Sequence, residues 1–165
     1  MIKIGITGSI GSGKSSLARK ASDFLDMPVF DADQAVADLY SDNNDLKAFL
    51  QKKCGQDIIQ NGLVDRSQLK IIMRDPKQVN TWKSIENEVQ RLVWVSFEQF
   101  VQDQQANGKK AIIADIPFLF ETKSEHFFDY TINVYLPYEA QKQRALNRTT
   151  PKLTAADFEQ RYRVF

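Results

Sequence analysis

Residues 2–15 read Ile-Lys-Ile-Gly-Ile-Thr-Gly-Ser-Ile-Gly-Ser-Gly-Lys-Ser, and this stretch decides the fold. Residues 2–7 form a short apolar run bounded by Gly8, which is typical of a buried strand. Apolar residues then recur at helical spacing over residues 15–25. The sequence therefore predicts a strand, a glycine-rich loop and a helix in direct succession.

The loop at residues 8–15 matches the phosphate-binding pattern G-x-x-x-x-G-K-[S/T] at every position. Its glycines let the backbone approach phosphate oxygens, and the following helix N-terminus favours anions. Lys14 is suited to the β- and γ-phosphates, and the Ser15 hydroxyl to Mg²⁺. The pattern also occurs by chance, but its position between a strand and a helix favours an ATP site. The predicted ATP-binding residues of this loop are Gly8, Ser9, Gly11, Ser12, Gly13, Lys14, Ser15 and Ser16.

Strand and helix patterns alternate along the rest of the chain, which predicts an α/β fold with a parallel sheet covered on both faces. Asp65 or Ser67 is expected to cap one helix, and Thr154 with Asp157 resembles a capping box that opens the last one. The further predicted strands are residues 28–30, 111–115 and 131–136. The further predicted helices are residues 34–40, 45–54, 67–73, 77–105 and 138–148, with a last one after Thr154.

The bulk properties favour one domain over residues 1–165. A net charge of +1 gives no reason to expect nucleic acid or a membrane as partner. No apolar run approaches the roughly 20 residues of a membrane span, and the N-terminal run lacks the features of a signal peptide. The single cysteine, Cys54, forms no internal disulfide, which fits a cytoplasmic protein.

Three acidic residues follow predicted strands, where ligands bind in open parallel sheets. Asp31 and Asp33 share a direction if the second strand persists, and one of them could accept the proton of a substrate hydroxyl. Capping of the next helix is the alternative for one member. Asp115 ends an apolar strand and is a candidate Mg²⁺ ligand, with a turn acid as its alternative.

Five segments in this order resemble the dephospho-coenzyme A kinase family. They are the phosphate loop, Asp31-Ala32-Asp33, the stretch at 62–69 with Asp65-Arg66, the stretch at 115–121 and the Gln141-x-x-Arg144-x-x-x-Arg148 helix. The resemblance implies a three-layer phosphate-loop kinase fold with a core at about 1–40 and 108–137, a helical acceptor-binding region at about 41–107 and a lid at about 138–160. It also implies that the family's usual C-terminal strand and helix are absent.

The implied activity is the last step of coenzyme A biosynthesis, transfer of the γ-phosphate of ATP to the ribose 3′-hydroxyl of dephospho-CoA. The implied catalytic residues are Asp33, Lys14 and Arg144, with Arg148 supporting Arg144 at ATP. The acceptor is expected to meet Asp33, Arg66, Pro117, Leu119 and Glu121. Ser15 and Asp115 are the implied Mg²⁺ ligands, and a monomer or weak homo-oligomer is expected.

Two positions depart from the family pattern. Glu86-Asn87 stands where relatives carry His-Pro, and Ala37 stands where an Arg or His often follows Asp-Ala-Asp. An acid in place of a cation changes the expected affinity for a phosphorylated acceptor. Two alternatives therefore stay open, another small-molecule kinase with the same loop and an ATP-binding module without turnover.

Overall fold

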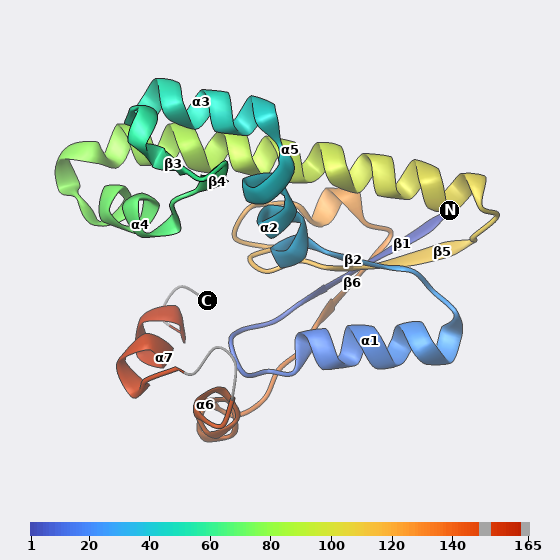
Figure 1. The fold of residues 1–165 in the computed structure, drawn as a ribbon. Coiled ribbons are helices and arrows are strands. Elements are labelled where there is room, and N and C mark those ends of the chain that lie inside the picture. Colours follow the sequence, from blue (N-terminus) through green and yellow to red (C-terminus); the bar gives the residue numbers. More distant parts are fainter. Residues whose placement is uncertain (149–152, 163–165) are drawn as a thin grey trace. The chain divides into compact units, whose positions relative to one another are not determined.

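A computed structural model of the protein describes residues 1–148 and 153–162 (Figure 1). The chain divides into two compact units. The first unit comprises Met1–Ala32 and the described part of Val101–Phe165, and the second unit is Asp33–Phe100. In the described ranges, no helix is long and apolar enough to cross a membrane.

The first unit is built on a parallel sheet, as the strand–helix alternation predicts. Its four strands lie in the order β2-β5-β1-β6, and each neighbouring pair is parallel. β1 is therefore central, with β5 on one side and β6 on the other. The strands are β1 (Ile2–Thr7), β2 (Val29–Asp31), β5 (Ala111–Asp115) and β6 (Tyr130–Asn133).

Both faces of β1 are covered within the first unit. On one face Ile6 packs in a buried cluster with Ile113 of β5 and Ala18 of α1 (Lys14–Leu25). The other face is so tightly packed that a Cβ on Gly5 would lie 2.7 Å from the Leu119 side chain. Leu119 belongs to the connection between β5 and β6, which also contains a short 3₁₀ helix, η3 (Glu125–Phe127). The predicted α/β arrangement is confirmed here.

Two short helices complete the first unit, α6 (Tyr138–Leu146) and α7 (Ala155–Tyr162). Ala145 of α6 and Phe158 of α7 are fully buried in one cluster, against which Ile10 of the phosphate loop packs. The predicted capping box at α7 is confirmed. The Thr154 amide donates to Asp157 Oδ2 at 3.0 Å, and the Asp157 amide donates to Thr154 Oγ1 at 3.1 Å.

The second unit is mainly helical. The antiparallel pair β3–β4 is joined by Asn61 and Gly62, both with positive φ. This Asn-Gly hairpin is absent from the predicted elements, although Asn-Gly between apolar runs is a strong hairpin signal. The elements are α2 (Ala32–Asp42), α3 (Asn44–Cys54), η1 (Gln56–Ile58), β3 (Ile59–Gln60), β4 (Leu63–Val64), α4 (Arg66–Arg74), η2 (Pro76–Gln78) and α5 (Val79–Ala106), whose last residues belong to the first unit.

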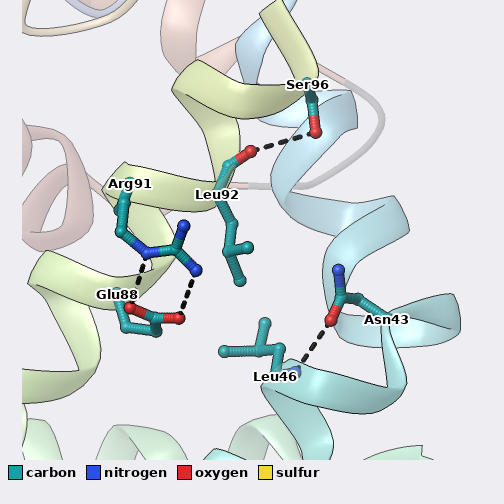
Figure 2. A network of polar contacts seen from close by, with 6 residues as sticks. All are labelled: Asn43, Leu46, Glu88, Arg91, Leu92 and Ser96. Atoms are coloured by element: carbon teal, nitrogen blue, oxygen red, sulfur yellow. Dashed lines mark hydrogen bonds and ion pairs between the residues drawn. The ribbon is translucent and has the colours of Figure 1, made fainter. Parts of the chain in front are cut away.

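Local contacts fix the helices of the second unit (Figure 2). Asn43 caps α3 by accepting a hydrogen bond from the Leu46 amide at 2.8 Å, and Asp65 caps α4 as predicted. Leu46 of α3 and Leu92 of α5 point toward one another, and both are buried (Figure 2). On the surface of α5, Arg91 pairs with Glu88 one turn earlier at 2.7 Å.

β6 is shorter than the predicted strand 131–136. The Val134 amide still donates to the Thr7 carbonyl at 2.8 Å, but the ladder then stops. The reason is that β1 ends at Thr7, where the chain turns into the phosphate loop, so residues 135 and 136 have no β1 residue opposite them. The end of β6 is thus set by a strand that lies far away in sequence.

Candidate active site

The glycines of the phosphate loop are needed for backbone shape and for close packing. Gly11 and Gly13 have φ of 78° and 96°, a region that side chains rarely adopt. A Cβ on Gly11 would collide with the Gln141 carbonyl, and one on Gly8 with the Val134 carbonyl. The loop therefore has its shape only because these positions lack a side chain.

The loop presents unused hydrogen-bond donors. The Ser12 hydroxyl is buried and has no hydrogen-bond partner among the described residues. Gly13, in the left-handed conformation, is the N-cap of α1 and offers no capping side chain, so the first amides of α1 are not capped by one. An orphaned hydroxyl beside uncapped helix amides suits an anion such as a phosphate group.

Lys14 and Asp115 meet at the end of the sheet. The Lys14 ammonium pairs with Asp115 Oδ1, and the Asp115 side chain is 3% exposed. Asp115 is the last residue of β5, and Lys14 is the first of α1. The pair therefore holds a mobile cation and a carboxylate together at the phosphate loop.

The predicted strand-end acids are found in two different settings. Asp31 ends β2 and lies in register with Asp115 on the neighbouring strand, as expected for acids at strand ends. The expectation that Asp31 and Asp33 share a direction requires that the strand persists, and this condition is not met, because β2 ends at Asp31 and α2 begins at Ala32. Asp33 lies in the first turn of α2 and is exposed.

A helix macrodipole favours an acid in that position. A structural role for Asp33 at the helix end therefore exists beside the predicted catalytic one.

Arg144 lies against the phosphate loop. Its guanidinium Nη1 is 3.2 Å from the point where a Cβ on Gly13 would be. Arg144 and Arg148 both lie on the exposed surface, Arg144 within α6 and Arg148 just after it. The structure thus brings Arg144 to the loop and leaves Arg148 without a described contact to it.

The predicted acceptor stretch after β5 divides into buried and accessible residues. Leu119 is fully buried behind β1, so its side chain serves packing. Pro117 is partly exposed and Glu121 is exposed. Glu121 lines a cavity of about 260 Å³ together with Gly8 and Ser9. The other lining residues are Thr7, Phe120, Asn133, Val134, Tyr135, Gln141 and Tyr162.

Arg66 lies in the second unit, where the first turn of α4 presents it to Tyr40. Its guanidinium lies over the Tyr40 ring, 5.5 Å from the centroid. Burial raises the pKa of Tyr40, and the Arg66 charge only partly opposes this. Tyr40 therefore stays a neutral aromatic surface that orients the arginine.

Two residues at the phosphate loop offer oxygen donors of the kind that Mg²⁺ binds. In the ranges 1–148 and 153–162, no group of three or more His, Cys, Asp or Glu side chains could hold a metal ion. A hydroxyl at Ser15, which is exposed, and a carboxylate at Asp115 are the hard oxygen donors that Mg²⁺ prefers. These two residues fit an ion that takes its remaining ligands from phosphates and water.

Two residues that meet the site have no role of their own in the sequence analysis, although Gln141 belongs to the pattern that resembles the family's lid helix. Gln141 is 1% exposed and bonds to Ser9 of the loop, and Ile10 packs into the α6–α7 cluster. Helical spacing was the available signal, because Gln141, Arg144 and Ala145 share one face of α6. The resemblance to the family's lid helix was a second signal at Gln141, whereas Ile10 had none, since isoleucine is common in loops.

Comparisons with known proteins agree with this geometry. A family model described as dephospho-CoA kinase matches residues 2–164. The dephospho-CoA kinase of Bartonella quintana (strain Toulouse) is 36% identical over 149 residues, which cover 88% of this chain and 72% of the relative. That of Nitrobacter winogradskyi is 35% identical over 159 residues, with 94% and 76% covered.

Solved structures share the fold. Protein TT1252 from Thermus thermophilus superposes with a TM-score of 0.77 at 27% identity, covering 99% of this chain and 79% of that one. A dephospho-CoA kinase from Campylobacter jejuni superposes with a TM-score of 0.62 at 19% identity, covering 98% and 78%. With the family model spanning nearly the whole sequence, the chain belongs to the dephospho-CoA kinase family.

Proposed function

We propose that this chain transfers the γ-phosphate of ATP to the ribose 3′-hydroxyl of dephospho-CoA, the last step of coenzyme A biosynthesis. The observation that carries the proposal is the phosphate loop, with its orphaned Ser12 hydroxyl and the Lys14–Asp115 pair, in a chain of this family. Phosphoryl transfer needs positioning and charge stabilisation more than covalent chemistry. The residues around this loop are suited to both.

The loop and α6 would hold the triphosphate. The first amides of α1 and the Ser12 hydroxyl would donate to its oxygens, and Lys14 would move from Asp115 to the β- and γ-phosphates. Arg144, beside Gly13, offers charge to the transferring group. Ser15 and Asp115 would hold Mg²⁺, which neutralises charge on the phosphates when it is bound.

Asp33, Arg66 and Glu121 are the residues that we propose to meet the acceptor. Asp33 would accept the hydrogen bond of the 3′-hydroxyl and take its proton as the 3′-oxygen bonds to the γ-phosphorus and the bond from that phosphorus to the departing ADP breaks. Arg66, held over Tyr40, would bind an anionic part of the acceptor, and Glu121 would face it from the cavity that Gly8 and Ser9 also line. Roles for Pro117, Leu119 and Arg148 remain predictions, with that of Leu119 limited to its backbone.

The decisive experiment is transfer of radiolabelled γ-phosphate from ATP to dephospho-CoA. Coenzyme A is the matched control acceptor, because its 3′-hydroxyl already carries a phosphate. We expect label in the product with dephospho-CoA and none with coenzyme A. Binding of ATP without transfer to dephospho-CoA would refute the proposal.

An acceptor panel of nucleosides and nucleotides distinguishes the alternative of another small-molecule kinase. One observation favours testing this alternative. Helix α5 continues without a break through Glu86 and Asn87, and Glu86 is exposed. Faster transfer to any of these acceptors than to dephospho-CoA would favour that alternative.

Asp33→Asn tests the proposed base. The amide cannot take the proton, so kcat should fall by about 10²–10⁴-fold while the Kd for ATP is unchanged. Asp38→Asn, at an exposed position of the same helix, is the control. Full activity of Asp33→Asn would remove its proposed role.

Location and assembly complete the proposal. The single cysteine fits a reducing compartment, and we propose a cytoplasmic enzyme that acts as a monomer or weak homo-oligomer. Size-exclusion chromatography with light scattering tests the assembly state.

A further inference from the structure

One face of α6 lies along the phosphate loop. Ser9 bonds to the Gln141 side chain, Gly11 abuts the Gln141 carbonyl, and Gly13 lies beside the Arg144 guanidinium. Ile10, between them, packs in the cluster around Ala145. Four residues of the loop therefore contact residues in the first two turns of α6.

Gln141 is the centre of this contact. Its side chain is almost fully buried, and its amide group is used at both ends. Oε1 accepts a hydrogen bond from the Ser9 hydroxyl, and Nε2 donates to the Leu136 carbonyl at 2.5 Å. The glutamine thus joins the loop to the segment that leads from β6 into α6.

The backbone of Gln141 fixes the same contact from a second direction. Its amide donates to the Pro137 carbonyl at 3.0 Å in the first turn of α6. Its carbonyl lies so close to Gly11 that no side chain fits at that position. Contacts at residue 141 thus limit how closely α6 approaches the loop, beside the packing of Ile10 against the Ala145 cluster.

Arg144 follows Gln141 by three residues and thus lies on the same side of the helix. Its long side chain is exposed, so packing of its own does not fix it. The position of its guanidinium beside Gly13 depends on where α6 is held.

We propose that Gln141 is a positioning residue for phosphoryl transfer, which docks α6 on the phosphate loop through Ser9 and Leu136 and so holds Arg144 at the γ-phosphate. It acts through Arg144 and does not itself contact the reacting atoms. The turnover part of this inference rests on the proposed function, whereas the nucleotide-binding part does not.

If Gln141 had only a structural role, its substitution would affect the protein differently. Loss of stability alone would lower the amount of folded protein and leave the properties of the folded fraction intact. Loss of positioning changes how the folded protein distinguishes ATP from ADP, because only ATP carries the γ-phosphate that Arg144 contacts. The two effects are therefore separable.

The test compares Gln141→Met with Gln143→Met. Methionine is close to glutamine in size and helix propensity but cannot make these hydrogen bonds. Gln143 is an exposed residue of the same helix and serves as matched control. Calorimetry gives the Kd for ATP and ADP, and thermal unfolding reports stability.

We expect Gln141→Met to reduce the preference for ATP over ADP by about tenfold, as loss of one charge-assisted hydrogen bond would. The control should keep the wild-type preference. Arg144→Ala should lower the preference by a similar factor, and adding Gln141→Met to it should change it no further. An unchanged preference in Gln141→Met, or additive effects in the double variant, would overturn the proposal.

A second variant and a measurement on the wild-type enzyme complete the test. If Gln141→Met does not fold, Gln141→Glu replaces it, since a carboxylate still accepts from Ser9 but cannot donate to the Leu136 carbonyl. Its ATP preference should fall, and a wild-type value would overturn the proposal. A wild-type enzyme that prefers ATP but does not phosphorylate dephospho-CoA would refute the proposed function and leave the role of Gln141 measurable.

Discussion

The phosphate loop of the first unit and the helix caps of the second unit are held in opposite ways. In the first unit the side chains at the phosphate loop bond to partners far away in sequence, with 101 positions between Lys14 and Asp115 and 132 between Ser9 and Gln141. In the second unit Asn43 and Asp65 bond to residues two or three positions away. The phosphate loop thus depends on the tertiary fold, whereas the caps at the starts of α3 and α4 depend on neighbouring residues.

This difference predicts how substitutions act. A change at the phosphate loop removes a link between distant segments and should affect both nucleotide binding and the first unit's stability. A change in the second unit should affect one helix or one ligand contact. The four predictions below test this contrast.

The largest effect is expected for Lys14→Met. It removes the proposed phosphate ligand and leaves the buried Asp115 carboxylate without its partner. We expect kcat to fall by about 10²–10³-fold, the loss typical of one transition-state contact, and ATP affinity to fall as well. Lys20→Met, at an exposed position of α1, is the control for the loss of positive charge, and equal activity of the two variants would contradict the prediction.

The next comparison uses two glycines with nearly equal φ, Gly11 at 78° and Gly62 at 79°. Gly62→Ala meets nothing within 4 Å and should cost only the about 1–2 kcal/mol of a left-handed alanine. Gly11→Ala collides with the Gln141 carbonyl in addition and should cost more. Urea denaturation measures both, and equal free-energy losses would remove the contrast between the two units.

Arg66→Ala is expected to act on one ligand only. The KM for dephospho-CoA should rise by about tenfold, as loss of a charge-assisted hydrogen bond predicts, while the KM for ATP stays unchanged. Arg74→Ala, at the other end of α4, should leave both constants unchanged. An Arg66→Ala effect on ATP rather than on the acceptor would disprove its placement in acceptor binding.

The smallest effect is expected for Asn43→Ala. It removes the cap of α3 and should cost about 1 kcal/mol of unfolding free energy without changing kcat. Asn44→Ala, which removes the next and exposed amide side chain, should stay within about 0.5 kcal/mol of wild type. Denaturation with a parallel activity assay checks both, and a loss of kcat in Asn43→Ala would show that α3 matters beyond its stability.

Features with a local cause could be predicted from sequence. The phosphate loop, the Asp65 cap and the Thr154–Asp157 capping box depend on residues within a few positions, and each has a distinct residue pattern. The Asn61-Gly62 hairpin could also have been predicted locally, because an Asn-Gly pair between apolar residues favours such a turn.

Features that depend on residues far away in the sequence could not be predicted. The end of β6 follows from the end of β1, and the burial of Gln141 follows from the docking of α6 on the loop. At Asp33 local signals were ambiguous, since an acid after a strand suits both an extended active-site residue and the first turn of a helix. The catalytic roles depend on contacts with the substrates, which no pattern of neighbouring residues specifies.

The order of strands β2-β5-β1-β6 has a consequence for folding. Both neighbours of β1 come after the second unit in the chain, so β1 cannot pair until residues 111–115 of β5 and 130–133 of β6 have been synthesised. Closing such a long loop costs entropy before any strand pairing offsets it, which makes sheet formation slow. The ATP site is then assembled late, and nucleotide binding, which favours only the completed site, should stabilise the finished sheet more than any earlier folding intermediate.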